Sequence, residues 1–180
     1  LSYGLSYGAP AQTFEGHDII LSAAEDDYPP FSVISSEGAA DGFSVELLRA
    51  SLNAMGRDVS FATGSWPEMK QLLIDRKIQV LPLVGRTPER KVLFDVSFPY
   101  RKMHGTLSVR SDETNIRNLS DLKNRSVAVL KGDNAEEFLL RSHLEAEIVP
   151  VASFEEALLE LSAGQHDAVV IQKLLAMQLI

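Results

Sequence analysis

The chain has 180 residues, of which 45% are hydrophobic, a formal net charge of −8 and no cysteine. Such a chain can bury a hydrophobic core in one domain or two small lobes, which excludes a disordered protein. The negative charge repels phosphate backbones and the basic residues are scattered, so no nucleic acid is expected as a partner. Without cysteine there is no disulfide framework, no thiolate nucleophile and no cysteine-based zinc site.

The first 17 residues are interpreted as an N-terminal tail. They contain a duplicated Leu-Ser-Tyr-Gly, at 1–4 and 5–8, followed by Ala9-Pro10-Ala11. Because Ala-x-Ala suits signal peptidase, residues 1–17 are either the remnant of a secretion signal or a flexible extension. No apolar run approaches the ~20 residues needed to cross a bilayer, so membrane attachment is expected only through segments outside this chain.

From Asp18 onward, strand-like and helix-like stretches alternate. Asp18–Ala23 is a short apolar run suited to a buried strand, Ser44–Met55 has helical apolar spacing, and Val59–Thr63 again reads as a strand. The helix is expected to stop at Gly56. These three stretches predict a βαβ unit.

A weak internal repeat predicts a second unit of the same kind. Ser65-Trp66-Pro67-Glu68 precedes the strand-like Val80-Leu81, and Ser153-Phe154-Glu155-Glu156 precedes Ala168-Val169. Both Ser-x-x-Glu tetrads are expected to be capping boxes that begin a helix. Two capped helices that each feed a parallel strand predict two similar α/β lobes.

The boundary between the lobes is predicted near Arg101–Met103. Phe94–Tyr100 is a proline-bearing extended stretch between the two sets of elements, where a crossover is expected. Lobe 1 is therefore assigned to residues 18–102 and lobe 2 to residues 103–180. The second lobe is expected to begin its parallel strands with Val127–Leu130.

No constellation for catalysis or for metal binding is found in the sequence. The four histidines lack ligand spacing: His17, His104, His143 and His166. Asp26 and Asp27 are adjacent in an extended stretch, so their side chains point to opposite sides and do not form an acid/base pair. We expect no enzyme activity, no metal and no cofactor.

The best candidate for ligand chemistry is Arg90. It follows Thr87-Pro88-Glu89, where Thr can cap a helical turn and Pro can take its first position, just past the predicted strand Val80–Leu83. A guanidinium at a strand's carboxyl end can hold a carboxylate through two hydrogen bonds. The alternative is an ordinary surface salt bridge.

Three further positions are weaker candidates. Gly132-Asp133-Asn134 joins a strand to a helix, where free N–H groups favour an anion, although Asp133 or Asn134 can equally be the helix cap. Trp66 and Tyr28 stand beside turns, where an aromatic ring either stacks on a ligand or packs in the core.

Several motifs resemble one family in order and spacing. They are Tyr28-Pro29-Pro30-Phe31, Gly42-Phe43-Ser44-Val45-Glu46-Leu47, Thr87-Pro88-Glu89-Arg90, Phe94-Asp95-Val96-Ser97-Phe98-Pro99-Tyr100, Leu119–Leu122 with Val127-Ala128-Val129, and Gly164–Val170. From about Asp18 to the end, the chain resembles the extracellular solute-binding proteins of family 3, the amino-acid-binding branch of type-two periplasmic binding proteins. The resemblance implies an α/β, two-lobed Venus flytrap that closes on its ligand.

The resemblance also implies site residues. Arg90 falls on the arginine that holds the ligand carboxylate, Trp66 and Tyr28 fall on aromatic pocket positions, and Asn134 falls on a hydroxyl residue that contacts the carboxylate. Four other positions depart from the family pattern. Glu25 stands where Asp is frequent, Gly85 and Leu83 replace small hydroxyl residues, and Gln172 replaces the acid that pairs with the ligand's α-ammonium.

The expected ligand-binding set is Glu25, Tyr28, Trp66, Gly85, Arg90, Asn134 and Gln172. A neutral Gln172 cannot compensate the desolvation of a cation as a carboxylate does. The expected partner is therefore a small-molecule ligand that is either an amino acid or a related carboxylate. The family's return crossover and closing helices have no counterpart before Ile180, so the second lobe and return crossover are expected to be truncated.

Two functions remain open. The residues Val80–Pro82 and Val84–Arg90 resemble the sensor members of the family more closely than its transport members. This resemblance implies an extracytoplasmic sensor domain of a membrane-anchored histidine kinase. A homodimer is then the expected assembly. The alternative is a free periplasmic protein that delivers solute to an amino-acid ABC transporter. A third reading, an enzyme like the few dehydratases with this fold, lacks an acid/base constellation.

Overall fold

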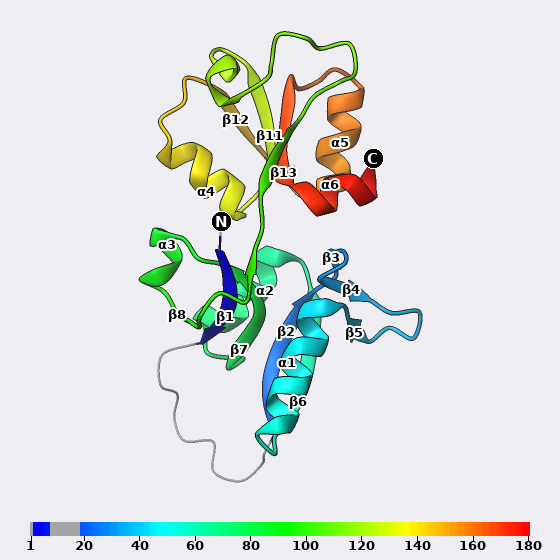
Figure 1. The fold of residues 1–180 in the computed structure, drawn as a ribbon, viewed down its shortest axis with the longest axis vertical. Helices are drawn as coiled ribbons and strands as arrows, with labels where there is room; N and C mark the ends of the chain where they lie inside the picture. Colours follow the sequence, from blue (N-terminus) through cyan, green and yellow to red (C-terminus); the bar gives the residue numbers. More distant parts are fainter. Residues whose placement is uncertain (1, 8–18) are drawn as a thin grey trace. The chain divides into compact units, whose positions relative to one another are not determined.

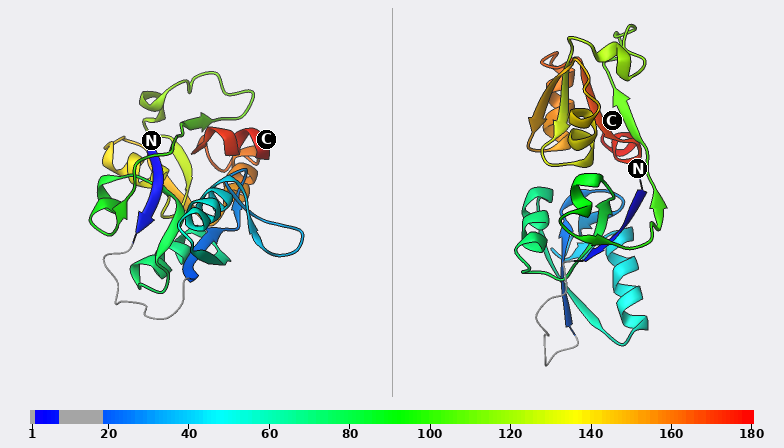
Figure 2. Two further views of the ribbon diagram at one scale, coloured as in Figure 1. Left: turned by 60° about the horizontal axis from the view of Figure 1, so that its bottom comes forward. Right: turned by 90° about the vertical axis from the view of Figure 1, so that its left-hand side faces the viewer.

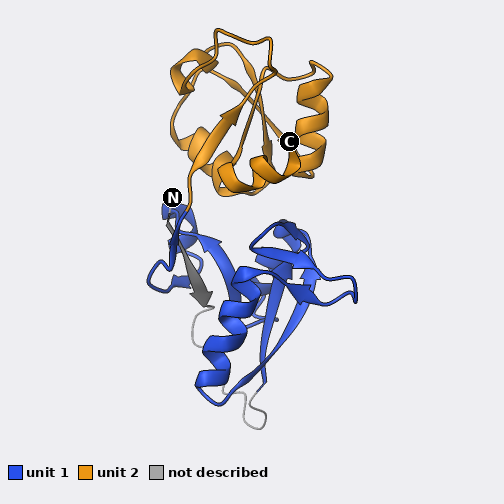
Figure 3. Ribbon diagram, turned by 45° about the vertical axis from the view of Figure 1, so that its right-hand side comes forward, with its two compact units in different colours: residues 1–102 blue, residues 103–180 orange. Residues whose placement is uncertain are grey.

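The structure is a computed structural model that describes residues 2–7 and 19–180. The chain divides into two compact units, residues 1–102 and 103–180 (Figure 3). Each unit has its own sheet and its own helices. Within the described residues, no helix is long and apolar enough to cross a membrane.

Unit 1 is built on a six-stranded sheet with the order β6-β2-β7-β1-β8, and β9 pairs with β1 (Figure 1). A small three-stranded sheet, β3-β4-β5, lies beside it. The elements of unit 1 are β1 (Ser2–Tyr7), β2 (Ile19–Glu25), β3 (Asp27–Tyr28), β4 (Ser32–Ile34), β5 (Ala40–Asp41), α1 (Phe43–Ala54), β6 (Asp58–Gly64), α2 (Trp66–Ile74), β7 (Val80–Gly85), α3 (Pro88–Lys91), β8 (Asp95–Val96) and β9 (Arg101–Lys102).

Two helices cover opposite faces of this sheet, as the right-hand view of Figure 2 shows for α1 (cyan) and α2 (teal). α1 buries Val45 and Leu48, and α2 buries Met69 and Leu73, at the three- and four-residue spacings that form one helical stripe. The expected βαβ unit is confirmed, because β2 and β6 are parallel and α1 connects them. α1 ends at Ala54, and Gly56 follows with a φ of 71°.

The N-terminal residues do more than form a tail. β1 lies antiparallel between β7 and β8, with Tyr3 opposite Gly85 and Tyr7 opposite both Val80 and Asp95. The interpretation of residues 1–17 as a tail is therefore wrong for Ser2–Tyr7, because their backbone pairs inside the sheet. Residues 1 and 8–18, which include the proposed signal-peptidase motif, lie outside the described residues.

Unit 2 contains a four-stranded sheet with the order β10-β13-β11-β12. β11 is parallel to β12 and β13, whereas β10 is antiparallel to β13. The elements of unit 2 are β10 (Gly105–Ser108), η1 (Leu119–Leu122), β11 (Ser126–Leu130), α4 (Asn134–Arg141), β12 (Glu147–Val151), α5 (Phe154–Ser162), β13 (Ala168–Gln172) and α6 (Lys173–Leu179).

The strand order of unit 2 places α4 and α5 on opposite faces of its sheet, as Figure 1 shows. The chain moves outward from β11 to β12 through α4 and returns to β13 through α5, so right-handed crossovers put the two helices on different faces. Val127, Val129 and Leu139 form the centre of the core on the α4 side. On α5, Phe154, Ala157 and Leu161 are buried at spacings of three and four.

The two predicted capping boxes differ in the structure. At the start of α2, both the backbone N–H and the hydroxyl of Ser65 donate to the Glu68 carboxylate. These bonds hold the pKa of Glu68 below its ordinary value of 4.5. At the start of α5, Ser153 accepts from the backbone N–H of Glu156 as expected, but the Glu156 carboxylate accepts from Ala152 N–H. The predicted reciprocal capping box at α5 is therefore wrong in one bond, because Glu156 accepts from the residue before Ser153 and not from Ser153 itself.

The chain segment that leaves unit 1 is anchored at Tyr100. Its hydroxyl donates to the carbonyl oxygen of Pro82 at 2.8 Å, and the Ser44 hydroxyl lies 3.1 Å from the same phenol oxygen. Burial raises the pKa of Tyr100 to about 12. In unit 2 the carbonyl of His104 accepts from Lys173 N–H at 2.9 Å.

Candidate functional site

Arg90 lies in unit 1 just beyond the carboxyl end of β7, as the sequence predicted. Two residues after β7, the hydroxyl of Thr87 accepts from the backbone N–H of Arg90 at 3.2 Å, and Pro88 begins α3. This cap fixes the short helix and directs Arg90 inward, since only 1% of the residue is exposed. The alternative of a surface arginine is therefore excluded.

The guanidinium of Arg90 stacks on the indole of Trp66. Its central carbon lies 4.7 Å from the ring centroid, and Trp66 is itself buried at the first position of α2. A flat guanidinium held against an aromatic face keeps its in-plane N–H groups directed outward from the stack. This arrangement suits the recognition of a planar carboxylate.

A small cavity adjoins this stack and includes Glu25. It is lined by Ala23, Glu25, Ser32, Trp66, Met69, Leu81, Pro82 and Leu83. Glu25 ends β2, the neighbour of β7, so both strands deliver residues to the same edge of the sheet. The hydroxyl of Ser32 donates to the Glu25 carbonyl oxygen at 2.5 Å, which ties β4 to this edge.

The other two predicted site residues of unit 1, Gly85 and Tyr28, lie at or within three residues of the carboxyl ends of β7 and β2. Gly85 is the last residue of β7 and is buried. Tyr28 is buried in β3, and its ring centroid lies 6.2 Å from that of Phe31. The ring of Tyr28 therefore packs in the core against Phe31, which is one of the two roles that the sequence left open for it.

The sequence did not predict Ser32, Met69 or Pro82 as residues of the cavity. For two of them, Ser32 and Pro82, a neighbouring motif in the sequence could have indicated the position. Ser32 directly follows Tyr28-Pro29-Pro30-Phe31, and Pro82 belongs to the strand that precedes Arg90. Met69 lies one helical turn after Trp66 and was indistinguishable from a core residue.

In unit 2, Asn134 and Gln172 follow neighbouring parallel strands. Asn134 is the first residue of α4, after β11, and Gln172 is the last residue of β13. Because β11 and β13 are parallel and adjacent, their carboxyl ends meet at one edge of the sheet. Both residues are buried. The cap of α4 is Asp133, whose carboxylate accepts from Ala135 N–H, so Asn134 is not consumed as the cap.

Gln172 has a structural task as well. Its side-chain oxygen accepts from the backbone N–H of Leu175 at 2.9 Å and thereby caps α6. The sequence offered no clue to this cap, because glutamine is not among the residues usually preferred at that position.

A larger pocket of about 630 Å³ in unit 2 does not include any of the predicted site residues. It lies between the segment after β10, α5 and the end of α6. Its lining is Val109, Arg110, Ser111, Asp112, Glu155, Leu158, Leu159, Leu161, Ser162, Leu179 and Ile180. Val109 follows Ser108, which pairs with Val169 near the amino end of β13, so the segment after β10 lies away from Gln172.

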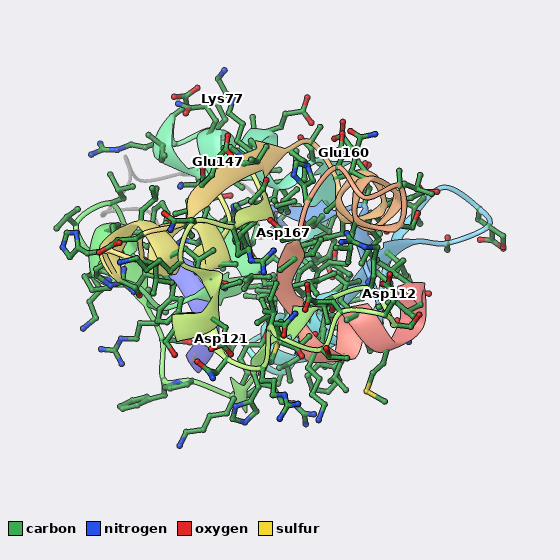
Figure 4. The ribbon with its side chains drawn as sticks, turned by 90° about the horizontal axis from the view of Figure 1, so that it is seen from above. Lys77, Asp112, Asp121, Glu147, Glu160 and Asp167 are labelled. Carbon is green, nitrogen blue, oxygen red and sulfur yellow. The ribbon has the colours of Figure 1, made fainter. Side chains whose placement is uncertain are left out.

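Acidic side chains are dispersed over unit 2. Figure 4 labels Asp121 on η1, Glu147 on β12 and Glu160 on α5, and it labels Asp112 and Asp167 on the segments after β10 and before β13. Among the described residues, no group of three or more acidic, histidine or cysteine side chains could hold a metal ion.

The comparison with protein families decides the assignment. Residues 20–138 match the model of the bacterial extracellular solute-binding proteins, family 3. The chain belongs to this family. The match covers the strands, helices and connections that carry Glu25, Trp66, Arg90 and Asn134, and it ends before Gln172.

Individual family members and solved structures agree with this assignment. The chain is 29% identical over 164 residues to the L-cystine-binding protein TcyJ of Escherichia coli (strain K12), covering 89% of this chain and 61% of that protein. It is 28% identical over 153 residues to the putative ABC transporter arginine-binding protein 2 of the same strain, covering 84% and 62%. The chain thus spans about three fifths of the length of these curated relatives.

A solved histidine kinase sensor domain with similarity to periplasmic binding proteins superposes with a TM-score of 0.85. The two chains are 29% identical, and the match covers 91% of this chain and 72% of that one. The expected fold class, the α/β fold of a type II periplasmic binding protein, is therefore confirmed.

Proposed function

We propose that this chain binds a small carboxylate-bearing solute, an amino acid or a related carboxylate, outside the cytoplasm. The observation that carries the proposal is Arg90, which is almost completely buried, fixed by the Thr87 cap and stacked on Trp66. The neighbouring cavity with Glu25 gives the same edge a second polar group. Relatives named for L-cystine and arginine binding support a ligand of this class.

The expected ligand set contains the five residues of unit 1 and the two residues of unit 2 described above. In each unit they stand at or just after strand ends, where open α/β sheets bind ligands. A panel of amino acids and carboxylates in a thermal-shift assay tests the binding, because a ligand that binds only the native state raises its Tm. A panel that leaves Tm unchanged at millimolar concentration contradicts the proposal.

We propose further that the chain is the sensor domain of a membrane-anchored signalling protein such as a histidine kinase. The likeness to a kinase sensor domain, with a TM-score of 0.85, supports this role. Phosphorylation of the full-length protein in vesicles, measured with and without the solute, tests it directly. A solute-dependent change supports the sensor role, and a homodimer is the expected assembly.

The alternative function is the free periplasmic binding protein of an amino-acid ABC transporter, which the named relatives favour. The two functions differ in what the full-length protein contains. A membrane-spanning segment and a kinase domain on the same polypeptide support the sensor, whereas solute uptake that depends on a released, freely diffusing protein supports transport. In neither case do we expect this domain to catalyse a reaction.

A further inference from the structure

The outer edge of the sheet in unit 1 carries exposed side chains that the proposed binding site does not use. β8 and β9 both pair with β1, with Asp95 opposite Tyr7 and Arg101 opposite Tyr3. The chain from 95 to 102 therefore runs along one edge, at the end of the sheet opposite to β6 (Figure 1). α3 ends only three residues before β8, so its last turn reaches the same edge.

Three hydrophobic side chains on this edge are exposed to solvent. Phe98 is 95% exposed, Val92 84% and Leu93 47%. Single exposed apolar residues are common on proteins, but these three lie within seven residues of one another. The segment is anchored by Phe94, which is buried and whose backbone N–H donates to the carbonyl oxygen of Arg90 at 3.0 Å. The exposed side chains therefore project from a backbone that is held in place.

The charged side chains around them are mostly positive. Lys91, Arg101 and Lys102 are exposed, and Asp95 is the only acidic residue from 91 to 102. This local excess of positive charge occurs in a chain whose formal net charge is −8. The exposed apolar and basic residues are together called the edge patch, and all six belong to unit 1: Lys91, Val92, Leu93, Phe98, Arg101 and Lys102.

The edge patch combines the two kinds of side chain that bind a lipid surface. A phenylalanine ring can enter the boundary between headgroups and acyl chains, while lysine and arginine side chains stay beside the lipid phosphates. Each Lys or Arg near an anionic leaflet raises the binding constant by roughly fivefold. The negative charge elsewhere on the chain opposes this attraction only weakly, because physiological salt screens charges that lie more than about 8 Å from the surface.

A protein partner fits the edge patch less well than a lipid surface does. A stable protein–protein interface buries about 800 Å² and takes roughly 20–30 residues from each partner. The six residues of the edge patch are far fewer, and basic side chains stand among the apolar ones where such an interface has its hydrophobic core. A bilayer requires only a few inserted apolar groups with cations beside them.

We propose that the edge patch of unit 1 binds the surface of an anionic phospholipid bilayer. Phe98 inserts among the headgroups, and Arg101 and Lys102 lie beside the lipid phosphates. This is a peripheral contact that needs no membrane-spanning segment. It goes beyond the binding of a solute and does not depend on the solute's identity.

Co-sedimentation of the chain with phospholipid vesicles tests the proposal. The anionic vesicles contain equimolar phosphatidylglycerol and phosphatidylcholine, and the neutral vesicles contain phosphatidylcholine alone. The binding constant for anionic vesicles should exceed that for neutral ones by about tenfold or more, and it should fall as salt is added. Phe98→Ser should weaken binding to anionic vesicles by about fivefold or more, and Arg101→Gln/Lys102→Gln by about tenfold or more.

Matched control variants remove the same groups from exposed positions outside the edge patch. Met177→Ser removes an apolar side chain that is 69% exposed on α6. Arg57→Gln/Lys131→Gln removes two exposed basic side chains, so its net charge equals that of the patch double variant. Both controls should bind anionic vesicles as the native protein does. A Tm equal to the native value in every variant shows that the fold is retained.

The outcomes decide between the edge patch and a general attraction. Binding by the native protein that is equal for the two kinds of vesicle, or absent from both, overturns the proposal. Native-like binding by Phe98→Ser or by Arg101→Gln/Lys102→Gln also overturns it, since the assigned residues would then not contact the lipid. Equal weakening in Arg57→Gln/Lys131→Gln would show that net charge, and not the edge patch, controls binding.

Discussion

At Arg90, a charged side chain is held out of water by its local sequence. The Thr87 cap, the short helix and the indole of Trp66 position the guanidinium before any ligand arrives. Such preorganisation reduces the entropy that binding must overcome. The same side chain is therefore expected to matter far more for affinity than the exposed Arg86, four residues earlier.

Arg90→Ala should weaken binding of the carboxylate ligand by roughly ten- to a hundredfold, because a charge-assisted pair of hydrogen bonds is lost. Arg90→Lys keeps the charge but loses the planar guanidinium, so its affinity for the ligand should fall between that of the native protein and that of Arg90→Ala. Isothermal titration calorimetry measures both. Arg86→Ala is the control and should bind as the native protein does; equal affinity in native protein and Arg90→Ala rules out the assigned role.

Tyr100 should titrate at an unusual pH. With a folded-state pKa of about 12 against an ordinary value of 10.0, the folded protein retains this proton while the unfolded chain releases it. Stability from the neutral phenol is thus complete below about pH 10 and is lost as the pH rises through about 12. The ultraviolet absorbance difference between native protein and Tyr100→Phe should show a phenolate midpoint near 12; a midpoint near 10 would contradict the burial of this hydroxyl.

Among the elements, α5 and the two inner strands of unit 2 are linked through one imidazole. The Nδ1 atom of His166 lies 2.9 Å from the hydroxyl of Ser126, and its Nε2 atom lies 2.9 Å from the carboxylate of Glu160. Ser126 begins β11, Glu160 belongs to α5, and His166 stands two residues before β13. The ring therefore connects three elements at the amino ends of the strands.

Removal of this connection should lower stability measurably. His166→Ala and Glu160→Ala should each reduce the free energy of unfolding by about 1–3 kcal/mol, since each leaves a polar partner unsatisfied. The double variant should be less destabilised than the sum of the two, because either change alone breaks the same bond. Urea denaturation of the four proteins measures this coupling. Strict additivity would mean that the two side chains act independently.

Elements with a local pattern were predicted well from the sequence, and elements that depend on distant pairing were not. The apolar stripe of Ser44–Met55 gave α1 to within a residue or two. β1 was missed because its repeated glycines and serines resemble a flexible extension, and its strand conformation comes from backbone pairing with β7 and β8. The capped turn that holds Arg90 was predicted from Thr87 and Pro88, whereas the cap formed by Gln172 depends on a helix start that has no usual signature.

At the scale of the whole molecule, unit 1 depends on a strand that precedes all its other elements. Deletion of residues 2–7 would leave β7 and β8 without the strand between them, so Tm should fall by at least about 10 °C. Scanning calorimetry of the shortened protein measures the change. A synthetic peptide of residues 1–9 added in excess should restore part of the loss, whereas an unchanged Tm would show that the sheet is stable without β1.

The place of β1 between β7 and β8 also determines the order in which the protein can fold on the ribosome. Residues 2–7 are synthesised before every residue they pair with, and their last partners, Arg101 and Lys102, are made at the end of unit 1. β2, α1 and β6 can assemble as soon as they emerge, but β2 and β1 have no strand between them until β7 has left the exit tunnel, and the other edge of β1 stays open until β8 and β9 follow. During that interval two strand edges are available to other nascent chains. The nascent chain can therefore pair wrongly with other chains while it is being synthesised. Slower synthesis through residues 80–102 lengthens this interval and should increase aggregation of the newly made protein.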